Sequence, residues 1–187
     1  IVNAAQENAD IIIFPEAAVT GLINNDDPKH DKIFAQPIPG AITNIFSMMA
    51  KRYNIYIEIG LFERKNGAIY DSALLFNSNG EIILKYRRRS SGWHSQNSDP
   101  KIYREGTSIP KVETEFGTIM ILICGDLFEN EIVEEVKMKN PNFLLFPFAR
   151  SFNEESGGRN FWEDVEIPEY INFAIKIGTT VLMVNYL

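Results

Sequence analysis

The sequence has few of the residues that form covalent or metal cross-links. It contains one cysteine and two histidines in 187 residues, so an internal disulfide is excluded and a zinc site would lack ligands. Basic side chains are also in the minority, 18 against 25 acidic ones, which gives a formal charge of −7. A nucleic-acid binder normally needs a basic face to displace counterions from phosphates, so this class of function is disfavoured. We expect no metal and no cofactor.

Long apolar runs are missing as well. No stretch approaches the roughly 20 apolar residues of a membrane span, and residues 1–14 lack the basic start and the small-residue cleavage site of a signal peptide. Apolar residues make up 45% of the chain and charged residues 23%, which is ordinary for a globular domain. These features predict a single cytoplasmic domain over residues 1–187, without a nucleic-acid or membrane partner.

Strand-like and helix-like segments alternate along the chain. Residues 55–61 alternate apolar and polar side chains with a period of two, which is typical of a strand. Residues 40–53 carry an apolar stripe at helical spacing. By the same criteria we predict strands at 11–14, 69–76, 82–86, 112–116, 119–124, 143–148 and 179–185, and helices at 1–9, 129–139 and 170–176. This order predicts a mixed sheet with helices on its outer face.

Two polar stretches, 87–110 and 151–163, interrupt these periodic segments. Loops of this length within a domain are usually functional, and we expect them to shape a binding pocket. Trp93, Phe161 and Trp162 are candidate pocket walls, although each of these aromatic side chains would serve equally well as packing. The chain begins and ends within regular segments, so we expect the domain to be incomplete at both ends.

Two polar residues follow buried apolar runs, where a rigid backbone can hold a side chain in a cleft. Cys124 ends the run ILIC before Gly125 and Asp126. It is a candidate nucleophile, and a buried, inert cysteine is the alternative. Backbone N–H groups after Cys124 would stabilise an oxyanion. Glu16 follows IIIFP and is a candidate general base, with a solvated or capping carboxylate as the alternative.

A basic cluster formed by Lys85 and residues 87–89 enters the first polar stretch. One of these cations would suit a position beside a thiolate and a developing oxyanion, while a solvated face is the commoner role of such a run. His94 and Asp99 leave a Cys-His-Asp site open as the weaker alternative, because spacing says nothing about their distance from Cys124. His30 is expected at the surface.

Taken in order, these segments resemble the nitrilase superfamily, the carbon–nitrogen hydrolases. ADIIIFPEAAVTGL is similar to the first motif of that family, YDSALLFNSNGEIILKYRRR to the approach to its second, and VETEFGTIMILICGDLFENE to its third. The resemblance implies an α+β fold, an α-β-β-α sandwich with mixed sheets and outer helices. It also implies Glu16 as general base, Cys124 as nucleophile, and a homodimer formed through the helices beside the nucleophile.

Two positions depart from the family pattern. The catalytic lysine of the second motif corresponds to Arg88, and a second glutamate found in many members corresponds to Gln96. A guanidinium can stabilise an oxyanion but, unlike an ammonium, it cannot exchange protons. Loss of one oxyanion stabiliser costs about 2.7–4 kcal/mol of barrier, roughly 100- to 1,000-fold in rate. Lys85 would replace the missing group only through a register shift that turns it to the other face.

The resemblance implies a hydrolase that cleaves a non-peptide carbon–nitrogen bond of an amide- or nitrile-type substrate through a cysteine thioester. We assign catalysis to Glu16, Arg88 and Cys124, and substrate binding to Gly125, Asp126 and Trp93. The alternative is a catalytically impaired or non-catalytic member that binds a small acyl ligand or a protein partner. The family spans nitriles, amides, carbamoyl compounds and acyl transfer, so the sequence leaves the substrate open.

Overall fold

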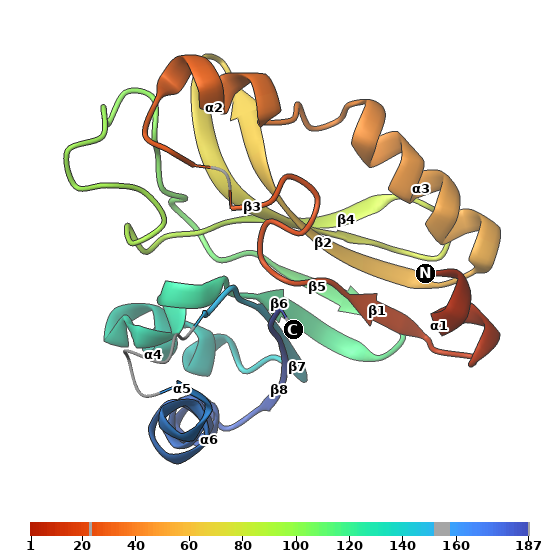
Figure 1. The fold of residues 1–187 in the computed structure, drawn as a ribbon. Helices are drawn as coiled ribbons and strands as arrows, with labels where there is room; N and C mark the ends of the chain where they lie inside the picture. The colour runs from red at the N-terminus through yellow and green to blue at the C-terminus, as the bar shows by residue number, and fades with distance from the viewer. Residues whose placement is uncertain (23, 152–157, 187) are drawn as a thin grey trace.

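The computed structural model describes residues 1–22, 24–151 and 158–186. Within these ranges the chain forms two four-stranded sheets that pack face to face, with helices on the outer side of each sheet (Figure 1). The strands are β1 (Ile11–Ile13), β2 (Tyr56–Lys65), β3 (Ala68–Phe76), β4 (Ile82–Arg87), β5 (Lys111–Thr114), β6 (Gly117–Ile121), β7 (Phe143–Pro147) and β8 (Thr180–Val184). The α-helices are α1 (Val2–Gln6), α2 (Pro28–Phe34), α3 (Ala41–Tyr53), α4 (Asn130–Lys139), α5 (Gly158–Phe161) and α6 (Ile167–Ile177).

The first sheet has the strand order β1-β2-β3-β4. β1 runs parallel to β2, whereas β3 pairs antiparallel with both of its neighbours. Alternate residues of β2 point toward α3, and Ile57, Ile59 and Leu61 form one apolar cluster with Ala50 of that helix. Every residue of β3 is buried, because this strand lies inside the sheet and both of its faces are covered.

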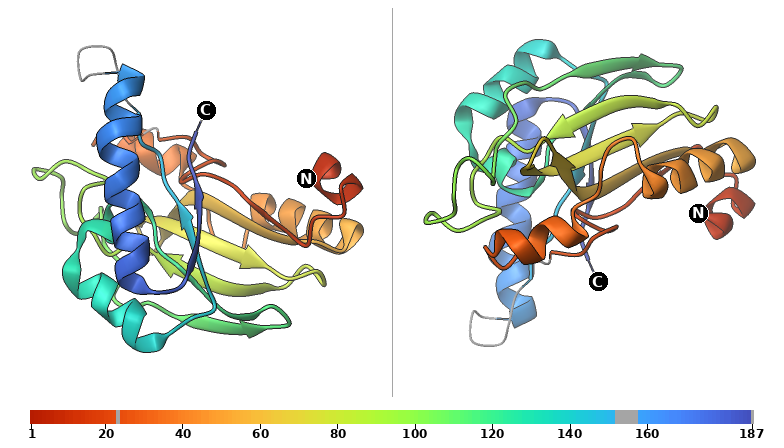
Figure 2. Two further views of the ribbon diagram at one scale, coloured as in Figure 1. Left: turned by 90° about the horizontal axis from the view of Figure 1, so that it is seen from below. Right: turned by 90° about the horizontal axis from the view of Figure 1, so that it is seen from above.

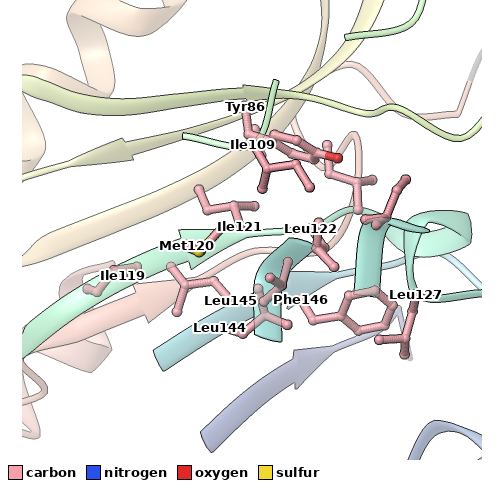
Figure 3. Packing of buried hydrophobic residues seen from close by; sticks show 14 of the residues in the cluster. Tyr86, Ile109, Ile119, Met120, Ile121, Leu122, Leu127, Leu144, Leu145 and Phe146 are labelled. Carbon is pink, nitrogen blue, oxygen red and sulfur yellow. The ribbon is translucent and has the colours of Figure 1, made fainter. Parts of the chain in front are cut away.

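The second sheet has the order β5-β6-β7-β8, with β5 antiparallel to β6 and the other pairs parallel. Its outer face is covered by α4 and by the helical run that contains α6 (Figure 2). Phe146 of β7 contacts Tyr170 of α6, with 6.0 Å between ring centroids. On the inner face, Tyr86 and Ile109 pack over Ile121 of β6 (Figure 3). Both sheets are mixed, so the expected α-β-β-α sandwich is confirmed.

Helical structure differs from the sequence prediction at α1, which ends at Gln6 rather than at residue 9, at α2, and in the run that contains α6. α2 was not predicted, because its apolar side chains, Ile33 and Phe34, are exposed and form no buried stripe. A local signal for α2 does exist, since the Asp27 side chain accepts a hydrogen bond from Lys29 N and Pro28 begins the helix. No helix in the described ranges is long and apolar enough to cross a membrane.

The second polar stretch is also more ordered than predicted. Residues 152–157 of that stretch lie outside the described residues, whereas α5 and a π-helical segment (Trp162–Glu166) form one continuous helical run with α6. The predicted helix at 170–176 therefore begins earlier than its apolar pattern indicated. It ends as expected at Gly178, whose φ of +78° and N–H bond to Ala174 O close the helix. The stretch 87–110 contains no helix and, beyond Arg87 at the end of β4, no strand.

Candidate active site

Glu16 lies in the turn that follows β1, and its side chain is buried. The turn has a left-handed residue, Ala17, with a φ of +50°, and Val19 N donates to Gly60 O at 3.1 Å. A Cβ atom at Gly60 would lie 2.5 Å from Ala17 N, which no real side chain tolerates. Gly60 therefore lets the turn approach β2 closely enough to carry Glu16 into the interior.

Arg88 follows the last residue of β4 and is also buried. Its backbone is held on both sides, because Arg88 N donates to Asp71 O and Gly106 N donates to Arg88 O, each at 2.8 Å. The guanidinium donates from Nη1 to Glu16 Oε1 at 2.8 Å and from Nε to Ser90 Oγ at 2.8 Å. The first and second sequence motifs thus meet in a buried ion pair.

Cys124 is the first residue of a 3₁₀ turn (Cys124–Phe128) that follows β6. Its φ of +43° lies in the left-handed region, a conformation that costs about 1–3 kcal/mol and is concentrated at functional sites. The next residue, Gly125, makes room for the arginine, since a Cβ atom there would lie 2.4 Å from Arg88 Nη2. The third motif is therefore in contact with the second.

Asp126 forms hydrogen bonds with both the second and the third motif. Its carboxylate accepts hydrogen bonds from Ser90 N at 2.7 Å and Arg89 N at 3.0 Å, and from Ile123 N at 3.0 Å and Tyr86 Oη at 2.7 Å. The side chain is 0% exposed and does not line the pocket described below, so the structure gives no support to the predicted role of Asp126 in substrate binding. Donors from the protein occupy the acceptor positions of the carboxylate. Asp126 thereby holds the loop at residues 88–90 against the cysteine turn (Cys124–Phe128).

One pocket of about 290 Å³ has Glu16, Arg88 and Cys124 in its wall. The remaining lining residues are Leu22, Asn24, Phe62, Gly92, Trp93, Ala149 and Arg150. Trp93 thus lines the pocket, as its predicted role in substrate binding requires. Gly125 is not among the lining residues. Its close approach to the Arg88 guanidinium is sufficient reason for a glycine at this position, without a contact to substrate.

The thiol of Cys124 lies in an environment that opposes its ionisation. Burial and the Glu16 carboxylate raise the pKa of Cys124 to about 12, and the positive charge of Arg88 only partly offsets them. The sulfur is thus a neutral thiol near neutral pH. A nucleophilic attack requires a base that removes the proton as the new bond forms, and Glu16, which lines the same pocket and acts on the thiol electrostatically, is able to accept it.

Asp71 is the main site residue that the sequence did not reveal. It lies in the middle of β3, is 1% exposed, and its Oδ2 is 3.7 Å from Arg88 Nη1. Burial and the neighbouring Glu16 raise the pKa of Asp71 well above its usual range, against the opposing charge of Arg88. The available signal was a carboxylate inside the predicted strand YDSALLF, because a buried acid inside a strand requires partners.

Arg150 was also missed. It follows β7 at the end of a parallel strand, where side chains converge on a site, and it lines the pocket. The guanidinium binds the Glu166 carboxylate, with Nη2 2.5 Å from Oε1. Asn185 holds the Arg150 backbone from the end of β8, accepting from Arg150 N and donating to Arg150 O, each at 2.9 Å.

Several other predicted residues lie away from the pocket. Trp162 packs against Phe148 and Tyr170, and Phe161 is exposed, so neither is among the residues of the pocket wall. Gln96 is exposed in the loop and does not provide a second acidic group beside Glu16. These corrections leave Trp93 as the predicted aromatic wall that the structure supports.

The remaining basic and histidine candidates have other partners. Lys85 Nζ binds Glu63 Oε1 at 3.0 Å, and the same carboxylate also binds Arg87. Lys85 is therefore not a substitute for the missing family lysine. His94 Nε2 lies 2.8 Å from Glu105 Oε1, and neither residue lines the pocket, which removes the support for a Cys-His-Asp site.

The fold and the site define an α-β-β-α sandwich with a cysteine, a carboxylate and a cation at converging strand ends. The sequence model of the carbon-nitrogen hydrolase family matches residues 1–165. The chain belongs to the carbon-nitrogen hydrolase family.

The chain is similar to curated proteins whose names give different activities. A citrullinase from Francisella tularensis is 24% identical over 80% of this chain and 53% of its own length. The omega-amidase NIT2 of Xenopus tropicalis is 25% identical over 96% of this chain and 64% of its own length. A formamidase of Bacillus cereus is 27% identical over 92% of this chain and 52% of its own length. The chain thus spans less than two thirds of each of these relatives.

Solved structures share the fold at low identity. A carbon-nitrogen hydrolase from Helicobacter pylori G27 superposes with a TM-score of 0.81 at 19% identity, over 98% of this chain and 64% of that one. A mutant amidase from Nesterenkonia sp. AN1, with acrylamide added at its active site cysteine, gives a TM-score of 0.76 at 15% identity over 98% of this chain and 67% of that one.

Proposed function

We propose that the protein hydrolyses a non-peptide carbon–nitrogen bond of an amide-type substrate, with Cys124 as the nucleophile. The observation that carries this proposal is the pocket whose wall contains Cys124, Glu16 and Arg88 together. Membership of the carbon-nitrogen hydrolase family supports the reaction class. The amidase and formamidase relatives support an amide-type substrate.

In the first step the sulfur of Cys124 attacks the carbonyl carbon of the bound amide. The S–H proton moves to the Glu16 carboxylate while the S–C bond forms, so no free thiolate has to accumulate against the raised pKa of Cys124. The carbonyl oxygen becomes an oxyanion. Arg88, whose Nη2 lies beside Gly125, and the backbone N–H groups after Cys124 would stabilise this charge.

In the second step the intermediate collapses and the C–N bond breaks. The leaving nitrogen takes the proton held by Glu16 and departs as ammonia or an amine, which leaves a thioester on Cys124. Glu16 then accepts a proton from an attacking water molecule, the S–C bond breaks, and this proton returns to the sulfur. One water is consumed, one acid is released, and both side chains regain their starting states.

A second candidate function is binding without efficient turnover, and the state of Arg88 favours it. The guanidinium is permanently charged and held by Glu16 and Ser90, so it cannot exchange a proton as the family lysine can. Such a site would bind a small acyl ligand in the pocket, or a protein partner, and would hydrolyse substrate slowly or not at all. A homodimer and a cytoplasmic location are further predictions from the family resemblance and the sequence.

Intact-mass measurement after incubation with a panel of small amides tests the proposal. We expect an acyl adduct on the chain that is lost in the Cys124→Ala variant, and the single cysteine makes the mass shift unambiguous. A panel with neither adduct nor turnover would contradict hydrolysis. Arg88→Lys separates the two candidates, because a gain of activity identifies the arginine as the defect in an intact pocket, whereas an unchanged inactive variant favours binding alone.

A further inference from the structure

We propose that Asp71 is a positioning residue that keeps its proton and donates a hydrogen bond to the Glu16 carboxylate. The catalytic part of this inference rests on the proposed function, whereas the protonation of Asp71 does not. In this arrangement, a carboxyl group from β3 occupies the neighbourhood of the general base. The loop position expected to carry a second acid holds Gln96, which is exposed.

The hydrogen-bond geometry is the first argument. Neither carboxyl oxygen of Asp71 has a nitrogen or hydroxyl donor among the described residues, although both atoms are shielded from water. The nearest cation, Arg88 Nη1, is 3.7 Å from Oδ2, beyond hydrogen-bond length. A carboxylate ion is a strong acceptor that is costly to bury without donors. A protonated carboxyl group beside Glu16 needs only one acceptor, and Glu16 provides it.

The balance of charge is the second argument. Glu16 and Asp71 flank one guanidinium, and all three side chains are 5% exposed or less. With both carboxyls ionised, the group would carry a net negative charge in the interior, and two close carboxyls avoid this by sharing one proton. Glu16 accepts a 2.8 Å bond from Arg88 and Asp71 accepts none, so the proton belongs on Asp71.

The other acidic groups around Asp71 act in the same direction, against the charge of Arg88. Asp126, on the cysteine turn, adds a negative charge, and burial with Glu16 raises the pKa of Asp71 well above its usual range while Arg88 opposes this. Tyr186 approaches from the end of β8, where its hydroxyl donates to Glu16 O at 2.9 Å. A thiolate on Cys124 would add further negative charge to the same site. Among the described residues, Arg88 is thus the cation that forms an ion pair with Asp71.

This arrangement has a consequence for catalysis. A hydrogen bond from Asp71 to one Glu16 oxygen, together with the bond from Arg88, fixes the orientation of the carboxylate that must face the thiol. Arg88 stays charged and cannot serve as an acid or base, so proton transfer in this part of the described structure falls to Asp71, Glu16 and Cys124. Ionisation of Asp71 at high pH would place a second negative charge beside the base and disfavour attack by sulfur.

Infrared spectroscopy at neutral pH tests the protonation directly and needs no turnover. We expect the wild-type spectrum to contain a protonated-carboxyl band that disappears in Asp71→Asn. Glu58→Gln is the matched control, because Glu58 is a second buried acid whose pKa is raised; it should remove a different band. A carboxylate band lost in Asp71→Asn would overturn the proposal. If that variant fails to fold, NMR titration of wild-type protein with ¹³C-labelled aspartate carboxyls gives the same answer.

Kinetics then test the positioning role. Asp71→Leu has similar volume but cannot donate, and we expect kcat to fall about 100-fold with KM nearly unchanged. Asp71→Asn retains a donor, so it should rescue kcat to within about tenfold of wild type and lose the alkaline limb of the pH profile. Equal losses in both variants would overturn the role. A wild-type protein without turnover would contradict the proposed function. The infrared result would still show whether Asp71 is protonated.

Discussion

The Nη1 atom of Arg88 lies 2.8 Å from Oε1 of Glu16, in an ion pair whose side chains are only 5% and 2% exposed. The pair joins the turn after β1 to the end of β4, two segments that are 72 residues apart. At this depth the charges gain little from water, so each depends on the other. The same contact therefore affects both the stability of the sandwich and the chemistry of the pocket.

Removal of the guanidinium should destabilise the fold. Arg88→Leu leaves the buried Glu16 carboxylate unpaired, and we expect the free energy of unfolding to fall by about 3–5 kcal/mol. Urea denaturation measures this change. Arg159→Leu is the matched control, since Arg159 is 81% exposed and water screens its ion pair, so its loss should change the free energy of unfolding little. Comparable losses of unfolding free energy in the two variants would show that the contact of Arg88 with Glu16 stabilises the fold no more than an exposed ion pair does.

The space at Gly125 should be required for activity. In Gly125→Ala the new Cβ would lie 2.4 Å from Arg88 Nη2 and must displace the guanidinium. A displacement of about 1 Å in a catalytic group lowers rates by roughly 100-fold, and steady-state kinetics with a processed amide would measure it. Gly92→Ala offers a graded comparison, because its Cβ would lie 3.3 Å from the same atom. A larger effect at Gly92 would contradict this account.

The rate of alkylation of Cys124 should depend on the charge of Glu16. Since the pKa of Cys124 is about 12, we expect the rate of alkylation by iodoacetamide to rise about tenfold per pH unit between pH 7 and 10. Glu16→Gln removes a negative charge that raises this pKa, so alkylation at pH 8 should become faster. Glu163→Gln, at an exposed position, should leave the rate unchanged. Slower alkylation of Glu16→Gln would argue against the electrostatic role of Glu16.

Glu58 should make the protein less stable as the pH rises. It is fully buried in β2, and burial raises its pKa well above 4.5, although Phe14 N donates to its Oε2 at 3.2 Å. The unfolded chain releases this proton above about pH 4.5 while the folded chain keeps it, so the free energy of unfolding falls with increasing pH up to the folded pKa. Glu58→Gln should flatten this part of the profile. Parallel wild-type and variant profiles would exclude Glu58 as the cause.

Local sequence patterns predicted the regular structure well where apolar periodicity is strong. The helix at 40–53 and the strands at 69–76 and 143–148 agree with α3, β3 and β7 to within about one residue. Prediction failed for α2, which has no buried stripe, and for the start of the run ending in α6. α2 begins at a capped N-terminus, and the run before α6 continues that helix toward its N-terminus.

The candidate nucleophile and base were identified from their positions after buried runs and from the resemblance to the family motifs. The contacts of Asp126 could not be predicted, because its place next to Cys124 in the sequence does not reveal that four donors surround its carboxylate. Asp71 was missed because its importance comes from a neighbour on another strand. A linear pattern contains no information about either set of contacts.

The sequence by itself determined the order of strands and helices and the polar residues that end the apolar runs, because these follow from local periodicity and backbone preference. Only the tertiary structure showed that the Arg88 guanidinium binds Glu16 directly, and that Asp71 lies beside the guanidinium. The physical reason is register: the pairing of Ser72 with Arg87 between β3 and β4 sets which side chains share the interior, and that pairing depends on segments distant in the chain.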